Sequence, residues 1–411
     1  MRVIVNQLPA LGIKTGIGHY TTELLRCLRA QAGDDQIDGF PEGWVRRARQ
    51  AAAQVRPYLE GRQAQGASST ASLAKLRTGV FQQVRHFGRG LMAQYFRLVY
   101  RLGRYDLYHE PNFIPLACDN PTVATLHDLS VLYHPEWHPA DRASYFEKNF
   151  HRGIARCIHF LAISEFGRQE VIRKLNIPPQ KVTRTYMGIR SGLGPLPASE
   201  VERVLRQLDL PPRYLLYLGT IEPRKNILLL LRAYCALPAP LRERWPLLLV
   251  GSWGWNTSEV AEYLHSEARH RGVIHLGYVA EEHLGVIYNG ARALVYPSLY
   301  EGFGLPPVEM MACGGAVLTS TTGALVETVG SRADLIPAED MDGWKNAMAR
   351  VLEDDDWWRS LRVGATAVAK PYTWERCAAD TLRVYRSLTA GSANLTSIAS
   401  ISTSKKLKAA G

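Results

Sequence analysis

The chain has 411 residues, of which 46% are hydrophobic, and a formal net charge of +11. That length exceeds a typical single core and suits two domains, and no apolar run is long enough to span a bilayer. Residues 1–6 form a strand-like run without the apolar segment of a signal peptide, so we expect a cytoplasmic protein. The six scattered cysteines lack the spacing of a metal site or a disulfide framework and are expected to be reduced.

The positive charge is concentrated in one stretch of the chain. Between Pro41 and Tyr105 there are twelve basic and two acidic residues, a difference of ten. Within this stretch, residues 80–99 place apolar side chains at helical spacing, which predicts a basic amphipathic helix. Two readings stay open: a domain helix with a solvated face, or a helix that docks on anionic lipid. We expect no nucleic-acid partner, because the sequence has no recognition motif and no ladder of aromatic residues.

Glycines and polar residues follow the strands expected in the first half of the chain. Gly16 and Gly18 lie between the first strand and an amphipathic helix, where a glycine loop lets a ligand phosphate approach closely. A dinucleotide-binding fingerprint would need glycine at Thr21, so that alternative is weak. His127 and Asp128 end a buried strand, at the edge where open α/β sheets bind their ligands.

Two cations follow the first strand of the second half. The apolar run 214–218 leads into a turn that carries Arg224 and Lys225 just before an apolar helix. Fixed cations at that point suit a pyrophosphate and the charge that develops when a nucleoside diphosphate leaves. A solvated charge pair is the alternative interpretation.

The stretch 296–315 combines the end of a strand, a glycine turn and a helix opened by two prolines. Glu301 and Glu309 lie eight positions apart within it, and carboxylates accept hydrogen bonds from hydroxyl groups. The expected ligand is therefore polyhydroxylated and carries phosphate. Its anion would lie at the backbone amides of the helix start, which belong to Phe303, Gly304 and Leu305.

This stretch resembles the Glu-x7-Glu signature of the retaining glycosyltransferases of family four. That family has the α/β GT-B fold, in which two Rossmann-like domains face a central cleft. The resemblance implies that Glu301 contacts the donor sugar, that Glu309 holds the nucleotide ribose and that His127 reaches the reaction centre. The string Glu-Pro-Arg-Lys-Asn around Arg224 and Lys225 is similar to that of a mannosyl- and rhamnosyltransferase-like subgroup.

Other positions match the family less completely. By resemblance, Gly16 and Gly18 approach the donor from the first domain, and the backbone of Tyr278 and Val279 holds the nucleobase. The chain departs from the family where it has Met187-Gly188-Ile189-Arg190 in place of Asn-Gly-Ile-Asp. It also has Gly219-Thr220 where many relatives have Gly-Arg, and it keeps a glutamate, Glu327, without the usual proline.

The resemblance also implies a division of the chain. The expected parts are an acceptor domain (1–190, with the basic helical segment 41–104), a linker (191–208), a nucleotide-sugar-binding domain (209–370), a terminal helix packing back on the first domain (371–388) and a disordered tail (389–411).

The function implied is that of a retaining hexosyltransferase. The donor would be a GDP-sugar, most naturally GDP-mannose or a GDP-deoxymannose, and the acceptor a hydroxyl of a lipid-linked or growing surface polysaccharide. No metal or cofactor is expected, because the candidate site has no aspartates at metal spacing and its cations would stabilise the leaving group. The alternatives are a UDP-sugar donor, a catalytically silent nucleotide-sugar-binding subunit, and a basic adaptor that binds a membrane or nucleic acid. If the basic segment docks on lipid, the protein would be peripheral on the inner face of the cell membrane.

Overall fold

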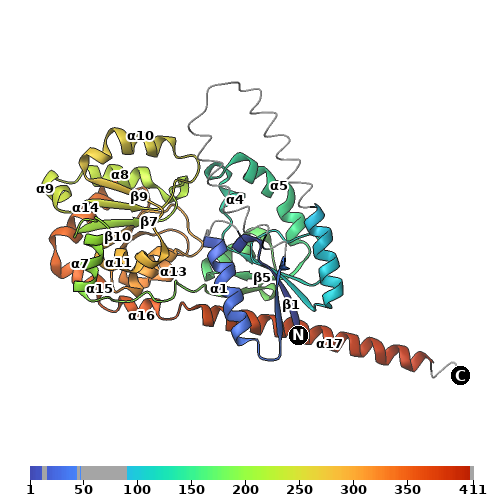
Figure 1. Ribbon diagram of the computed structural model, residues 1–411. Helices are drawn as coiled ribbons and strands as arrows, with labels where there is room; N and C mark the ends of the chain where they lie inside the picture. Colours follow the sequence, from blue (N-terminus) through green and yellow to red (C-terminus); the bar gives the residue numbers. More distant parts are fainter. Residues whose placement is uncertain (12–15, 44–46, 48–89, 408–411) are drawn as a thin grey trace.

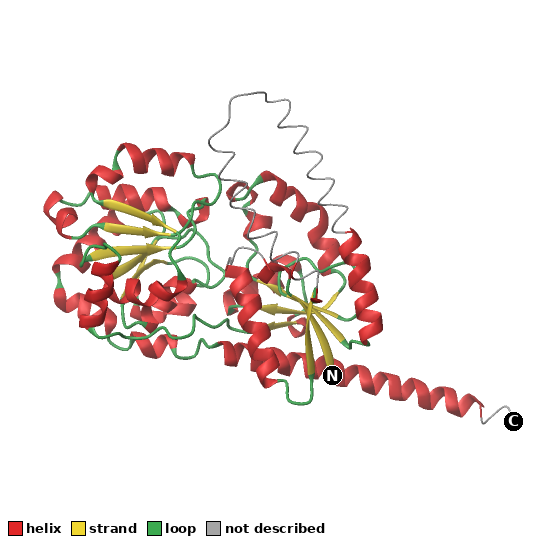
Figure 2. Cartoon of the chain, viewed as in Figure 1, coloured by secondary structure: helices red, strands yellow, loops and turns green. Residues whose placement is uncertain are grey.

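The computed structural model describes residues 1–11, 16–43, 47 and 90–407, with side chains up to residue 390. The loop residues 12–15, most of the basic segment 41–104 and the first half of the helix expected at 80–99 lie outside the described residues, as do residues 408–411. The described chain forms two α/β domains that lie side by side (Figures 1 and 2). Each is a parallel sheet of six strands with helices on both faces, which is the GT-B architecture expected from the sequence.

The first domain has the strand order β2-β1-β3-β4-β5-β6. Its strands are β1 (Arg2–Asn6), β2 (Gln36–Phe40), β3 (Leu107–Glu110), β4 (Thr122–Leu126), β5 (Cys157–Ala162) and β6 (Val182–Arg184). Its helices include α1 (Gly16–Gln31), α4 (Ser130–Tyr133), α5 (Ala140–Ile154) and α6 (Glu165–Leu175).

The second domain has the strand order β12-β11-β10-β7-β8-β9. Its strands are β7 (Tyr214–Leu218), β8 (Leu247–Val250), β9 (Val273–Gly277), β10 (Ala291–Tyr296), β11 (Ala316–Ser320) and β12 (Asp334–Ile336). Its helices are α7 (Ala198–Gln207), α8 (Ile227–Cys235), α9 (Ala239–Arg244), α10 (Ser258–Ser266), α11 (Glu281–Gly290), α12 (Leu305–Ala312), α13 (Leu325–Val329), α14 (Met341–Glu353), α15 (Asp355–Arg362) and α16 (Ala365–Ala369).

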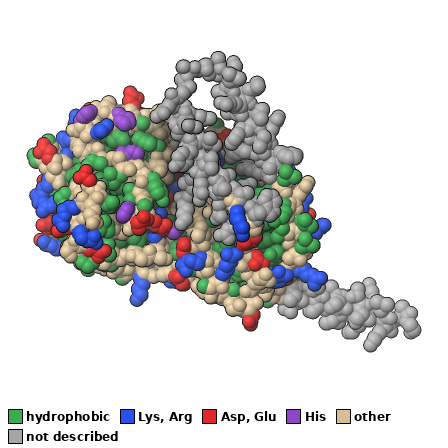
Figure 3. Space-filling model, in the orientation of Figure 1, with side chains coloured by type: hydrophobic (Ala, Val, Ile, Leu, Met, Phe, Trp, Pro, Cys, Tyr) green, Lys and Arg blue, Asp and Glu red, His purple; other side chains and the backbone are tan. Residues whose placement is uncertain are grey.

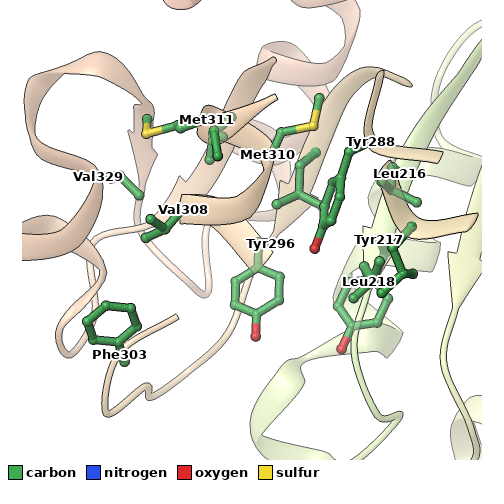
Figure 4. Close-up of a cluster of buried hydrophobic side chains, with 14 of the residues drawn as sticks. Leu216, Tyr217, Leu218, Tyr288, Tyr296, Phe303, Val308, Met310, Met311 and Val329 are labelled. Atoms are coloured by element: carbon green, nitrogen blue, oxygen red, sulfur yellow. The ribbon is translucent and has the colours of Figure 1, made fainter. Parts of the chain in front are cut away.

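The central strands are buried because helices cover both faces of each sheet. Every residue of β4, β7 and β8 is buried, as expected of a parallel sheet. In the second domain, Tyr217 and Tyr296 on neighbouring strands stack with their ring centroids 5.9 Å apart. Figure 4 shows both hydroxyl groups pointing the same way out of this cluster. The cluster therefore carries polar groups to the carboxyl ends of β7 and β10.

The terminal helix α17 (Trp374–Leu407) crosses from the second domain to the first and packs along α1 (Figure 1). Its Tyr385 hydroxyl lies 2.5 Å from Nδ1 of His109, whose Nε2 lies 2.8 Å from the Thr125 hydroxyl. His109 is thus a buried structural residue that joins the helix to the first sheet. Helix α17 runs to Leu407, through the stretch from residue 389 for which disorder is expected, and the division of the chain stays a prediction.

Residues 90–103 form a helix at the edge of the first domain. Phe96 and Tyr100 on its inner face are buried in a cluster with Phe40 and Tyr108. This packing fits the reading of a domain helix. The outer face mixes apolar and polar side chains: Leu91, Leu98 and Leu102 are its exposed large apolar residues, and Gln94, Arg97 and Arg101 are exposed beside them.

Within the described residues, no helix is long and apolar enough to cross a membrane. Figure 3 shows basic and acidic side chains interspersed over the described part of the face in view. All six cysteines are buried free thiols.

Candidate active site

The start of α12 has the geometry of an anion site, and two features of the local sequence explain why. Gly304 takes a left-handed conformation (φ 86°) at the N-cap, and a Cβ there would overlap the side chain of Leu325. Pro306 and Pro307 occupy the first turn, where a missing N–H costs no hydrogen bond. The Phe303 ring packs in the interior, so only its backbone can serve a ligand.

Glu301 lies in front of this helix start and is bound by both cations of the second-domain turn. Its Oε1 accepts hydrogen bonds from Nζ of Lys225 and, at 2.8 Å, from the hydroxyl of Tyr296. Its Oε2 lies 3.1 Å from Nη1 of Arg224, whose Nε donates to Glu222 at 2.6 Å. The parallel sheet brings these residues together, because β7 and β10 are neighbours with their carboxyl ends at one edge.

Charge and burial at this cluster act against each other. Burial alone would raise the pKa of Glu301, but Lys225 and Arg224 outweigh it and lower that pKa to about 2. Burial and the charge of Arg224 lower the pKa of Lys225, so the Glu301 carboxylate is what favours its charged form. Glu301 is therefore ionised at neutral pH and fixed in place by the groups that would meet a diphosphate.

Glu309, the residue expected to hold a ribose, already has protein partners. Its carboxylate is fully buried and accepts from Nη1 of Arg190 at 2.7 Å and 2.5 Å, one distance to each oxygen. The Arg190 backbone N–H lies 3.3 Å from Oε1, and the Tyr288 hydroxyl lies 2.8 Å from Oε2. Arg190 and Tyr288 were not among the expected site residues. The sequence showed that Arg190 replaces the aspartate of the family motif, but it did not show that Arg190 pairs with Glu309.

His127 directly follows β4, and its backbone carbonyl lies beside Gly302 of the second domain. Its Nε2 lies 2.8 Å from the backbone carbonyl of Pro111, which can only accept, so Nε2 carries the proton. Burial lowers the pKa of His127, and the ring is neutral with Nδ1 as its basic atom. The neighbouring Asp128 accepts from the Ser130 backbone and hydroxyl at 2.9 Å and 2.7 Å. One of the two ring nitrogens of His127 thus has a structural bond, and only Nδ1 is left for a ligand.

The expected glycines of the first domain lie in the first turn of α1. Gly16 is exposed and Gly18 is buried. The next residue, His19, approaches the second domain, with Nδ1 3.9 Å from the carboxylate of Glu281. His19 was not anticipated, although its place directly after the glycines was a usable signal.

The expected nucleobase contacts lie on the loop after β9. The Tyr278 side chain is 71% exposed, and Val279 is partly buried against the core. Neither side chain makes a described bond to the other candidate residues, so their assignment remains a prediction.

Two second-domain residues join the domains beside the cleft. The carboxylate of Glu327 accepts from the backbone N–H groups of Glu165 at 2.7 Å and Phe166 at 2.9 Å, at the start of α6, and from the Tyr186 hydroxyl at 2.6 Å. The Tyr300 hydroxyl bonds to Glu170 of α6. Sequence reasoning noted Glu327 without a role, because its partners lie far away in the chain.

Family models match both halves of the chain. The model described as Glycosyltransferase Family 4 matches residues 15–191, and the model described as Glycosyl transferases group 1 matches residues 200–366. The chain is also 38% identical over 284 residues to the O-antigen chain mannosyltransferase B of Escherichia coli, covering 69% of this chain and 74% of that protein. The chain belongs to glycosyltransferase family 4. This family 4 protein is an enzyme of the hexosyltransferase type.

Another relative and two solved structures are also similar to the enzyme. The serotype-specific mannosyltransferase WbdA of Escherichia coli is 29% identical over 320 residues, which cover 72% of this chain but only 39% of WbdA. Sucrose-phosphate synthase from Thermosynechococcus elongatus has a TM-score of 0.70 at 21% identity, covering 95% of this chain and all of that one. Anabaena HepE, solved with UDP and glucose, has a TM-score of 0.64 at 16% identity over 95% of this chain and all of its own. At such identities the structures support the GT-B fold alone.

Proposed function

We propose that this enzyme transfers mannose or a deoxymannose from a GDP-sugar, with retention of configuration, to a hydroxyl of a lipid-linked or growing surface polysaccharide. The observation that carries the proposal is the cluster of Glu301, Lys225 and Arg224 at the start of α12. The mannosyltransferase names of its relatives support the sugar. The O-antigen chain named for one relative supports a polysaccharide acceptor.

The cluster supplies charge stabilisation where the leaving group would form. A diphosphate bound at Gly304 would meet the helix start, and Arg224 and Lys225 would approach its oxygens. We propose that these cations suffice without a resident metal or cofactor. A chelator should then leave the rate unchanged, and loss of activity that Mg²⁺ restores would contradict this point.

In the proposed reaction, the bond from the anomeric carbon to the donor phosphate breaks, and the acceptor oxygen bonds to the same face of the sugar. The departing phosphate oxygen takes the proton of the acceptor hydroxyl. Glu301 and Nδ1 of His127 would orient the sugar, and Glu309 would hold the ribose. Retention requires that the new bond has the configuration of the donor, which NMR of the product reads directly.

Thermal melting with five nucleotides tests the donor assignment. A ligand that binds only the folded state raises the midpoint, so GDP, UDP, ADP, GDP-mannose and UDP-glucose are compared. We expect GDP and GDP-mannose to raise it, and Lys225→Met to abolish the shift while the exposed control Glu339→Ala keeps it. A shift with the uridine nucleotides alone would replace the guanine assignment. If none of the five nucleotides raises the melting midpoint, the proposal is overturned.

We also propose that the enzyme contacts the anionic inner face of the cell membrane through the outer face of the helix at residues 90–103. Leu91, Leu98 and Leu102 are 53%, 55% and 75% exposed on this face. Arg101 and Arg104 are exposed near them. Apolar side chains beside cations suit the boundary between acyl chains and anionic headgroups. A lipid-linked acceptor would be presented at that surface.

A further inference from the structure

The Glu309 carboxylate has no hydrogen-bonding capacity left for a ribose in this conformation. A carboxylate offers about four acceptor positions. Here Oε1 receives the backbone N–H and Nη1 of Arg190, and Oε2 receives Nη1 of Arg190 and the Tyr288 hydroxyl. A ribose diol needs the same acceptor positions, because it presents two adjacent O–H donors. Ribose and guanidinium therefore compete for one carboxylate.

The Arg190 side chain has a second carboxylate and open space nearby that it can reach when it leaves Glu309. Its Nε already lies 3.5 Å from Oε1 of Glu281, at the start of α11. Arg190 also borders a cavity of about 500 Å³ at the hinge between the domains, which is lined as well by Ser191, Lys370 and Glu375. A rotation of the side chain would thus keep one carboxylate partner and expose the guanidinium to open space. Tyr288 cannot be displaced as easily, because its ring is fully buried.

We propose that Arg190 occupies the ribose position of the donor site and that the ribose diol displaces it from Glu309 when the donor binds. The proposal rests on the assignment of Glu309 as the ribose-binding residue in the proposed function. Arg190 then lowers the affinity of the enzyme for the donor, because the donor has to displace it. Each hydrogen bond that a ribose hydroxyl gains on Glu309 replaces one that Arg190 loses, so the hydroxyls add little net affinity in the natural protein.

The sign of the coupling between Arg190 and the ribose hydroxyls distinguishes displacement from direct help. If Arg190 is displaced, its removal increases the contribution of the ribose hydroxyls to the binding free energy. If Arg190 instead orients Glu309 or itself holds the ribose, its removal decreases that contribution. A double-mutant cycle in which one change is in the ligand measures this sign.

Calorimetric titration of the full chain with GDP and with 2′,3′-dideoxy-GDP provides the cycle. For the natural protein we expect dideoxy-GDP to bind less than about 3-fold more weakly than GDP. For Arg190→Met we expect GDP to bind about 10-fold more tightly and the dideoxy penalty to exceed about 10-fold. Arg190→Lys keeps the charge with fewer donors and should give intermediate values. The control Glu339→Ala changes an exposed residue that makes none of these bonds, so it should leave the dideoxy penalty unchanged.

A dideoxy penalty that is unchanged or smaller in Arg190→Met overturns the displacement, while GDP binding by the natural protein keeps the proposed function standing. If the natural protein binds no nucleotide, the proposed function fails and the displacement fails with it. Melting of each variant without ligand checks its fold. If Arg190→Met does not fold, Arg190→Lys decides the question: a larger penalty than in the natural protein supports displacement, and an equal or smaller one overturns it.

Discussion

Gly302 lies directly against the backbone carbonyl of His127, so that a Cβ added to the glycine would overlap that oxygen. Gly302 follows Glu301 in the second domain, and His127 directly follows β4 of the first, so the contact is a close approach of the two domains beside the candidate reaction centre. A side chain at this point would push the His127 segment away from Glu301.

We therefore expect Gly302→Ala to lower kcat by about 100-fold, since a displacement of roughly 1 Å at a reacting centre has such an effect. Gly194→Ala is the matched control, because a Cβ there meets no atom within 4 Å. Steady-state kinetics and the melting midpoint of both variants make the test. A Gly302→Ala enzyme of normal kcat would show that the domains need not approach this closely.

The Glu301 charge should make stability depend on pH in the acid range. Its folded pKa of about 2 lies below the ordinary value of 4.5, so the stabilisation is complete above pH 4.5 and is lost as the pH falls towards 2. The shift corresponds to about 3 kcal/mol at neutral pH. Glu301→Gln should be less stable than the natural protein by about that amount at pH 7 and by about 1 kcal/mol at pH 3. Urea unfolding at both pH values measures this, and a difference that does not shrink at pH 3 would contradict the account.

The contacts of Glu327 should hold the two domains together. Its carboxylate caps the first turn of α6, where a negative charge is favourable, so Glu327→Ala removes a charge-assisted contact across the cleft. We expect a larger radius of gyration by X-ray scattering and a kcat lowered about 10-fold, with GDP affinity within about 2-fold of the natural value. Glu282→Gln, at an exposed position in the first turn of α11, is the control. If Glu327→Ala loses GDP binding and keeps its compact shape, Glu327 belongs to the donor site instead.

Membrane contact should depend on the exposed leucines of the helix at residues 90–103. Leu98→Glu/Leu102→Glu should lose cosedimentation with vesicles that contain phosphatidylglycerol, because burial of these side chains drives the contact. Val363→Glu, which changes a 62% exposed residue of the second domain, should sediment as the natural protein does. Equal sedimentation of all three proteins would exclude this face as the lipid contact.

The sequence was informative where residues act close to their place in the chain. Apolar runs predicted the central strands, and the parallel sheet then brings Arg224 and Lys225 to Glu301, because neighbouring strands end at one edge. Prolines and glycines marked the start of α12 for reasons of backbone geometry.

The sequence was less informative about bonds that depend on how the domains meet. Arg190 and Glu309 are 119 positions apart, and no local pattern shows that they pair. The partners of Glu327 are likewise distant.

The most direct test of the central claim is transfer of radiolabelled mannose from GDP-mannose to a lipid extract from cells that make a surface polysaccharide. The natural enzyme should release GDP and place label in the lipid-linked glycan. Lys225→Met should do neither, because the Glu301 carboxylate and the leaving diphosphate both lose their buried cation. Equal transfer by Lys225→Met, or labelling by the natural enzyme from UDP-hexoses but not from GDP-mannose, would contradict the account.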